Sequence, residues 1–135
     1  MSKTTEKTIT GEQIARRIAE LLDDKKGVDI VALDVRGLAN FADYFLVCTG
    51  RSDRQTKSIH DGIREGMKAE FEMLPVHTEG EGERRWILLD YGDVIAHVMI
   101  PEVREYYRLE QLWSDAPQLE LELSPDEPVV ADDAA

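Results

Sequence analysis

The chain is short of positive charge, and this shortage excludes several kinds of partner. Its 135 residues contain 16 Lys and Arg against 28 Asp and Glu, which gives a formal net charge of −12. Contacts with nucleic-acid phosphates depend on Lys and Arg, so this balance argues against DNA and against an electrostatic grip on RNA. It suits a protein that meets a basic protein surface, although a need for solubility would explain it equally well.

Cysteine and long apolar runs are also scarce. Cys48 is the only cysteine, so no disulfide can form within the chain, and its place in the apolar run 44–48 predicts a buried structural thiol. Residues 1–10 are polar and lack the apolar core of a secretory signal. No apolar run approaches the ~20 residues that span a bilayer. We therefore expect a cytoplasmic protein with no membrane partner.

The length and the distribution of composition predict one folded domain between two flexible ends. Residues 1–9 are expected to be a flexible N-terminus, and residues 10–115 to form the domain. Residues 116–135 contain three prolines, six acidic side chains and no Lys or Arg. Such a segment buries too little apolar surface to offset its ordering entropy, so a disordered acidic tail is predicted there.

Hydrophobic periodicity and breaker residues predict helices and strands that alternate at first and then close with a hairpin. The expected order is a helix at 11–25 capped by Thr10 and Gln13, buried strands at 29–35 and 44–49, a long helix from Ser52 to Pro75, a strand at 75–79, a hairpin of strands at 86–91 and 94–100, and a helix at 102–111. The prediction is an α/β single domain with a mixed β-sheet of about five strands, flanked by helices mainly on one face. Gly62 and Gly66 within the long helix predict close approach of a neighbouring element.

The hairpin has two faces of different character. With Gly92 and Asp93 in the turn, one face is uniformly apolar and forms the expected core: Ile87, Leu89, Tyr91, Val94, Ala96 and Val98. The other face combines aromatic, thioether and polar side chains: Trp86, Leu88, Asp90, Ile95, His97 and Met99. This mixture is typical of a protein docking site. The alternative is that the last helix packs on this face and makes Trp86 a core residue.

The residues offer no convincing catalytic or metal site. The three histidines are scattered without metal-ligand spacing, and neither a phosphate-binding Gly-Lys-Thr loop nor a dinucleotide fingerprint is present. The turn at 49–52 could bind an anion, and Asp34, Asp90 and Asp93 could then be Mg²⁺ ligands. A phosphoryl-transfer site requires two carboxylates side by side close after such a turn, and the sequence does not supply them. We predict no catalytic residue, no metal and no cofactor.

A whole-domain pattern resembles one known family. The residues that carry the resemblance are Asp29-Ile30, Leu33-Asp34-Val35, Ala42-Asp43-Tyr44-Phe45, Thr49-Gly50 and Ser52 in the first half, and Glu79-Gly80, Glu83, Trp86 to Asp90, Gly92 to Met99, Arg104, Tyr107, Leu109-Glu110 and Leu112-Trp113-Ser114 in the second. With them the chain resembles the ribosomal silencing factor family, also called the Iojap family, over about residues 10–115.

The resemblance implies a fold similar to that of nucleotidyltransferases, without their catalytic carboxylates, and a protein that is not an enzyme. It implies binding to the large ribosomal subunit through ribosomal protein L-fourteen. There the factor would sterically block joining of the small subunit and so repress translation when nutrients are scarce. Two alternatives are a nucleotidyltransferase-like enzyme, which would bind nucleotide and Mg²⁺, and an adaptor for another basic protein.

The resemblance also implies a docking surface on the mixed face of the hairpin. The expected partner-binding residues are Trp86, Leu88 and Met99 as apolar anchors, Asp90 and Asp93 as partners of basic side chains, His97 as a hydrogen-bonding group, and Tyr107 at the rim. Since an exposed apolar patch can also pair with itself, a homodimer is expected as one form of the free protein.

Overall fold

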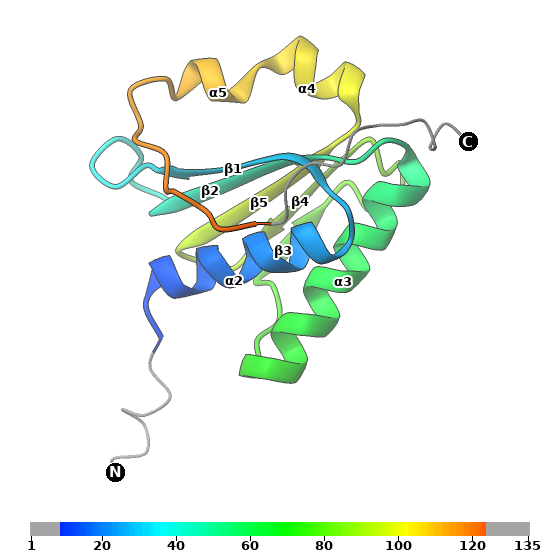
Figure 1. Cartoon of the computed structure of the whole chain (residues 1–135), viewed down its shortest axis with the longest axis horizontal. Coiled ribbons are helices and arrows are strands. Elements are labelled where there is room, and N and C mark those ends of the chain that lie inside the picture. The colour runs from blue at the N-terminus through cyan, green and yellow to red at the C-terminus, as the bar shows by residue number, and fades with distance from the viewer. Residues whose placement is uncertain (1–8, 124–135) are drawn as a thin grey trace.

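A five-stranded mixed sheet organises residues 9–123, the part of the chain that the computed structural model describes (Figure 1). Its strands are β1 (Val28–Asp34), β2 (Tyr44–Thr49), β3 (His77–Glu79), β4 (Trp86–Asp90) and β5 (Val94–Met99), in the spatial order β1-β2-β5-β4-β3. Only β2 and β5 run parallel, and β2 is buried along its whole length. A strand covered on both faces reads as a continuous apolar run, as β2 does. The predicted α/β class and mixed five-stranded sheet are confirmed.

The first strand differs from its prediction. β1 was expected to be buried, but it lies at an edge of the sheet, and only Ala32 and Leu33 are buried along it. Its pairing with β2 is interrupted between Val28 and Val31, where Asp29 adopts a left-handed backbone with φ of 53°. An irregularity of this kind ends regular pairing at an edge.

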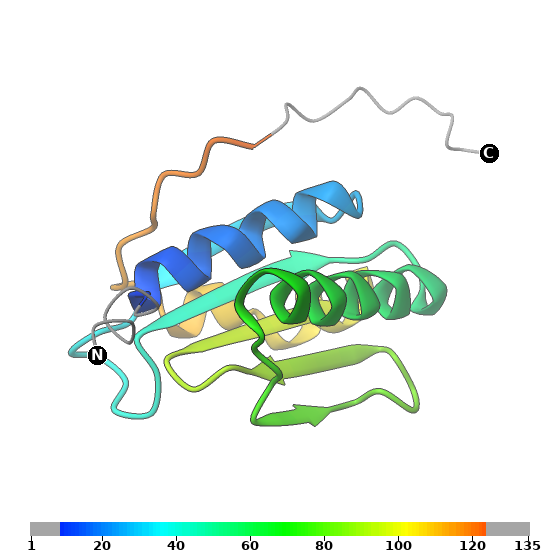
Figure 2. The same ribbon diagram turned by 90° about the horizontal axis from the view of Figure 1, so that it is seen from below.

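Two long helices, α2 (Gly11–Asp24) and α3 (Asp53–Phe71), cover one face of the sheet side by side (Figure 2). The predicted capping box is confirmed: the Gln13 amide N donates to Thr10 Oγ1 at 3.1 Å, and the Thr10 amide N donates to Gln13 Oε1 at 2.8 Å. The Ser52 cap of α3 is confirmed too, with its Oγ 3.2 Å from the Gln55 amide N.

The long helix ends earlier than predicted. The helix stops at Phe71, because Glu72 turns left-handed with φ of 56° and its amide donates back to Lys68, so Pro75 does not terminate it. The predicted close approach at the two glycines is confirmed. A Cβ at Gly62 would lie 2.6 Å from Lys25 Cε, and one at Gly66 would lie 2.6 Å from Leu21 Cδ2. A larger residue at Gly66 would displace the buried side chain of Leu21, whereas at Gly62 the exposed side chain of Lys25 can turn aside.

Two short helices, α4 (Pro101–Tyr107) and α5 (Leu109–Leu112), lie across the opposite face (Figure 1). The single helix predicted at 102–111 is therefore wrong: Arg108, with φ of 52°, breaks it. The two long helices share one face, as expected, and these two short helices add a partial cover to the other. Val103 of α4 is buried against Val47 and Met99, so this face carries a small core of its own.

The predicted disordered tail is wrong for residues 116–123. Residues 117–123, which we call the strap, pass from the α5 side of the sheet to the α2 side (Figure 1). The strap bonds to the open edge of β1, where Pro117 O accepts from Asp34 N at 2.8 Å and Leu119 N donates to Ala32 O at 2.9 Å. Composition averaged over the whole tail hides three alternate leucines that an open edge can bury. Predicted disorder at 124–135 and flexibility at 1–8 fall outside the described residues.

No helix within residues 9–123 has both the length and the apolar character that a membrane crossing requires.

Candidate docking surface

The hairpin of β4 and β5 has the predicted register. Trp86 pairs with Met99, Leu88 with His97 and Asp90 with Ile95, while the alternate residues pair among themselves. The apolar set lies in the main core under α2 and α3. The mixed set therefore lies on the opposite face, beside α4 and α5, as strand parity predicts.

Aromatic rings form a continuous row across this second face. From one end to the other the aromatic row consists of Phe41, Trp113, Phe45, His97, Trp86, Tyr107 and Tyr106, with successive ring centroids 4.9 to 6.4 Å apart. The interior rings of Phe45 and His97 are buried, whereas Phe41 is 59% exposed and Tyr106 79% exposed. The row thus stiffens the face from within and presents apolar surface to solvent at both ends.

Trp86 and His97 are joined by a hydrogen bond at the centre of the row. Trp86 Nε1 donates to His97 Nδ1 at 3.1 Å. Because an indole N–H can only donate, Nδ1 must be unprotonated and the neutral imidazole carries its proton on Nε2. Burial lowers the pKa of His97 to about 4, so the ring is neutral at physiological pH. His97 therefore acts as a neutral acceptor that orients Trp86.

This buried histidine makes the stability of the fold depend on pH. The pKa of His97 is lowered in the folded state, so the unfolded chain binds the extra proton between its ordinary pKa and about 4. We expect the contribution of neutral His97 to the free energy of unfolding to be fully present above pH ~6.5 and to be lost as the pH falls toward 4. At ~1.4 kcal/mol per pKa unit, the loss is at most about 3 kcal/mol. Urea unfolding of His97→Gln, whose amide oxygen can still accept from Trp86, should show a shallower loss over this range. Identical slopes for the two proteins would contradict this role.

The structure brings four of the predicted site residues together with His97. Trp86 and Leu88 are half-buried on neighbouring pleats of β4. Tyr107 is 50% exposed, with its ring centroid 4.9 Å from that of Trp86. Asp90 lies at the end of β4, where Oδ1 accepts from the Gly92 amide N at 2.8 Å and so stabilises the hairpin turn. One carboxylate oxygen of Asp90 is thus engaged in the turn.

Two predicted residues do not join this surface. Met99 is completely buried beneath α4, against Val47 and Val103, because α4 begins directly after β5 and folds back over it. An already buried side chain removes no further area from water, so Met99 cannot be an anchor in the way predicted. Asp93 lies beside the first turn of α2, since a Cβ at Gly11 would be 3.5 Å from its Cβ. It is therefore on the helix-covered side and does not join the others.

Sequence reasoning missed several exposed apolar residues of this face. Phe41 belongs to the connection before β2, Tyr106 to α4, and Leu112, which is 73% exposed, to α5. Strand parity says nothing about residues in loops or short helices. A signal did exist, because large apolar side chains in short polar segments need either a core or a partner.

An ion pair holds α4 and α5 to the sheet. Arg104 Nη1 donates to Thr49 Oγ1 at 2.8 Å, and Arg104 Nε donates to Glu110 Oε2 at 3.1 Å. Partial burial works to raise the pKa of Glu110, but the hydrogen bonds and charge of Arg104 outweigh it and hold this pKa below its ordinary value. The charged Glu110 and Arg104 therefore tie the two short helices to each other and to β2.

Asp34, one of the three aspartates considered as possible Mg²⁺ ligands from the sequence, forms an ion pair with Arg36. Its two oxygens accept from Arg36 Nε at 2.9 Å and Nη2 at 2.7 Å, and these hydrogen bonds lower its pKa. Within residues 9–123, no group of three or more His, Cys, Asp or Glu side chains could hold a metal ion.

The fold and this face together describe a small α/β domain with an aromatic-rich surface. A family model described as "Ribosomal silencing factor during starvation" matches residues 8–135. The ribosomal silencing factor of Bacillus subtilis is 43% identical over 112 residues, which cover 82% of this chain and 93% of that protein. The chain belongs to the ribosomal silencing factor family.

Solved structures agree with this assignment. A crystal structure of a protein from Chromobacterium violaceum matches with a TM-score of 0.75 and 34% identity, over 91% of this chain and 96% of that one. A crystal structure from Bacillus halodurans matches with a TM-score of 0.66 and 36% identity, over 82% and 96% of the two chains.

Proposed function

We propose that this chain silences ribosomes by docking on the large ribosomal subunit, through ribosomal protein L-fourteen, so that the small subunit cannot join. Family membership supports the ribosome as the target. The observation that carries the docking step is the aromatic row, whose exposed ends lie on the face opposite the long helices. Rigid aromatic side chains with partly exposed surface are the usual energetic anchors of protein interfaces.

We assign the docking surface to the exposed side of this face. Its exposed residues are Trp86, Leu88, Asp90 and Tyr107 from the sequence prediction, with Phe41, Tyr106 and Leu112 added. The predicted residue His97 is buried and would act through Trp86, which it orients. Trp86 and Tyr107 would be the central anchors, because their rings are in contact and both retain exposed area. Met99 supports them from beneath, and Asp93 lies outside the surface.

Charge favours a basic partner of this kind. The chain has a net charge of −12, and ribosomal proteins that contact RNA carry an excess of Lys and Arg. Opposite charge on two surfaces speeds their encounter more than it strengthens the final complex. Silencing then requires only that the bound protein fill the space of the small subunit, so no bond is made or broken and no catalytic residue is needed.

A homodimer would compete with docking, since a second copy would cover the same apolar residues. An interface of this type is self-complementary about a two-fold axis. Sedimentation equilibrium of the free protein tests this point, and a dimer that still binds subunits with full affinity would place its interface on another face.

Co-sedimentation with purified large and small subunits tests the proposal, followed by a subunit-joining assay. We expect binding to large subunits only, and fewer joined ribosomes as the protein is added. A protein that stays at the top of the gradient, or that binds large subunits without reducing joining, would overturn the proposed function.

Calorimetry with nucleotide and Mg²⁺ tests the enzyme alternative, which requires that both bind. Capture of other basic proteins without ribosomal material would favour the adaptor alternative.

A further inference from the structure

The short helix α5 cannot hold its own position. It comprises four residues, and none of them is buried. One helical turn is unstable in water unless its surroundings fix it. On its α4 side α5 is held by the Arg104–Glu110 ion pair and by Leu109, which packs against the cluster of Val47, Met99 and Val103. On the other side, the chain that follows α5 must supply it.

The segment directly after α5 packs against this face through Trp113 and Ala116. The Trp113 ring stands edge-on against Phe45, with centroids 5.3 Å apart, and against Phe41 at 6.4 Å. Ala116 is buried in the same cluster, and its amide N donates to Trp113 O at 2.9 Å. Trp113 therefore links α5 to the buried part of the aromatic row.

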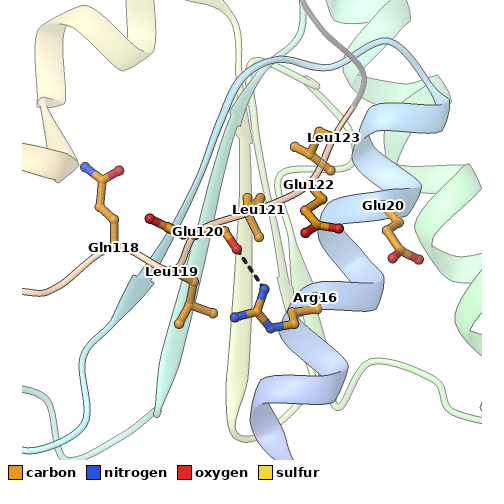
Figure 3. Close-up of a pocket in the computed structure, with 8 residues that line it drawn as sticks. All are labelled: Arg16, Glu20, Gln118, Leu119, Glu120, Leu121, Glu122 and Leu123. Carbon is orange, nitrogen blue, oxygen red and sulfur yellow. Dashed lines mark hydrogen bonds between the residues drawn. The ribbon is translucent and has the colours of Figure 1, made fainter.

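Immediately after Ala116, the strap bonds to elements outside the docking face. An antiparallel bridge joins Gln118 to Leu33 of β1, flanked by the two backbone hydrogen bonds to Asp34 and Ala32. Farther along, Arg16 Nη1 of α2 donates to Glu120 O at 2.8 Å (Figure 3).

The strap has two unlike sides. Its leucines at 119, 121 and 123 pack against the main core. Its polar side chains at 118, 120 and 122 are exposed. Residues 118–123, together with Arg16 and Glu20, line an open pocket of about 920 Å³ (Figure 3), so the leucines are only partly buried. The leucine side therefore holds the strap to the protein, while the polar side remains available for substitution without loss of packing.

We infer that the strap is a positioning element of the docking surface, and this inference rests on the proposed function. By attaching to β1 and α2, it fixes Ala116 and Trp113, and through them α5 and the Phe41 end of the aromatic row. Release of the strap would leave Trp113 and α5 without their second support. The protein would then have to order these side chains at the moment of docking, which weakens binding.

The test compares two double variants that each place two glutamines in the strap. Leu119→Gln with Leu121→Gln removes the apolar contacts, whereas Glu120→Gln with Glu122→Gln alters only the polar side. In the leucine variant we expect faster hydrogen–deuterium exchange at residues 109–116 and unchanged protection of β5. We also expect roughly tenfold weaker binding to large subunits, because a few side chains must then be ordered on binding. The glutamate variant should match the unchanged protein in both measurements.

Each outcome decides a definite point. Unchanged exchange at 109–116 in the leucine variant overturns the inference, and so does tighter binding, which would make the strap an inhibitor. If the leucine variant loses β5 protection as well, Arg16→Ala replaces it. This change removes the hydrogen bond to Glu120 O of the strap and the ion pair with Glu12 within α2, and exchange at 109–116 must still rise. If the unchanged protein does not bind large subunits, the proposed function fails, while the exchange measurement still decides whether the strap holds α5.

Discussion

Alanine at Gly80 is expected to lower the free energy of unfolding by about 3 kcal/mol or more. Gly80 has φ of +85°, a conformation that strains residues with a side chain by ~1–3 kcal/mol. Its added Cβ would lie 1.9 Å from the carbonyl oxygen of Trp86 and 2.9 Å from the carbonyl carbon. The backbone at Trp86 cannot move away easily, because it begins the paired strand β4. Overpacking against such a fixed group adds typically ~1–3 kcal/mol.

Gly82 provides the matched control two positions along the same loop. A Cβ at Gly82 would meet nothing within 4 Å, so Gly82→Ala should change the unfolding free energy by no more than about 0.5 kcal/mol. Urea unfolding of both variants, monitored by tryptophan fluorescence and circular dichroism, measures the difference. Equal stability of the two variants would show that Gly80 does not approach Trp86 as closely as described.

Trp86→Ala should weaken binding to large ribosomal subunits by about 30-fold or more, because loss of a central interface tryptophan usually costs at least ~2 kcal/mol. The ring lies at the middle of the aromatic row, between His97 and Tyr107. Trp86 is only half-buried, so the variant should remain folded with a modestly lower melting temperature. Trp86→Phe keeps an aromatic ring but loses the donor to His97, and we expect an intermediate affinity.

Val76→Ala is the control for that measurement. Val76 is apolar and 76% exposed, but it precedes β3 at the far edge of the sheet. Its truncation should leave binding unchanged. A folded Trp86→Ala protein that sediments with large subunits as the unchanged protein does, or an equal loss with Val76→Ala, would remove Trp86 from the docking surface.

Sequence patterns correctly predicted the features that depend on residues close together in the chain. The capping box at Thr10, the Ser52 cap and the two faces of the β4–β5 hairpin each depend on residues close together in the chain, and each is confirmed. The edge position of β1 was missed, because periodicity identifies a strand without giving its place in the sheet. Its neighbours are decided by long-range packing.

The position of the candidate docking residues was predicted only in part, because part of it depends on long-range packing. Parity placed Trp86, Leu88 and His97 correctly on the second face. It could not show that α4 folds back over Met99, since burial on that face depends on a helix that follows in the chain. The strap was missed because average composition, dominated by acidic residues and proline, concealed the spacing of its leucines.

The parallel pairing of β2 with β5 also bears on how the protein is made. These two central strands are separated in the chain by α3, β3 and β4, so the middle of the sheet can close only after residue 99 has been synthesised. Pairings between distant segments form slowly and leave unfinished edges exposed meanwhile. Nascent chains halted before Val94 should therefore show unprotected amides in β2, and the domain should acquire its fold late in translation, as one cooperative event.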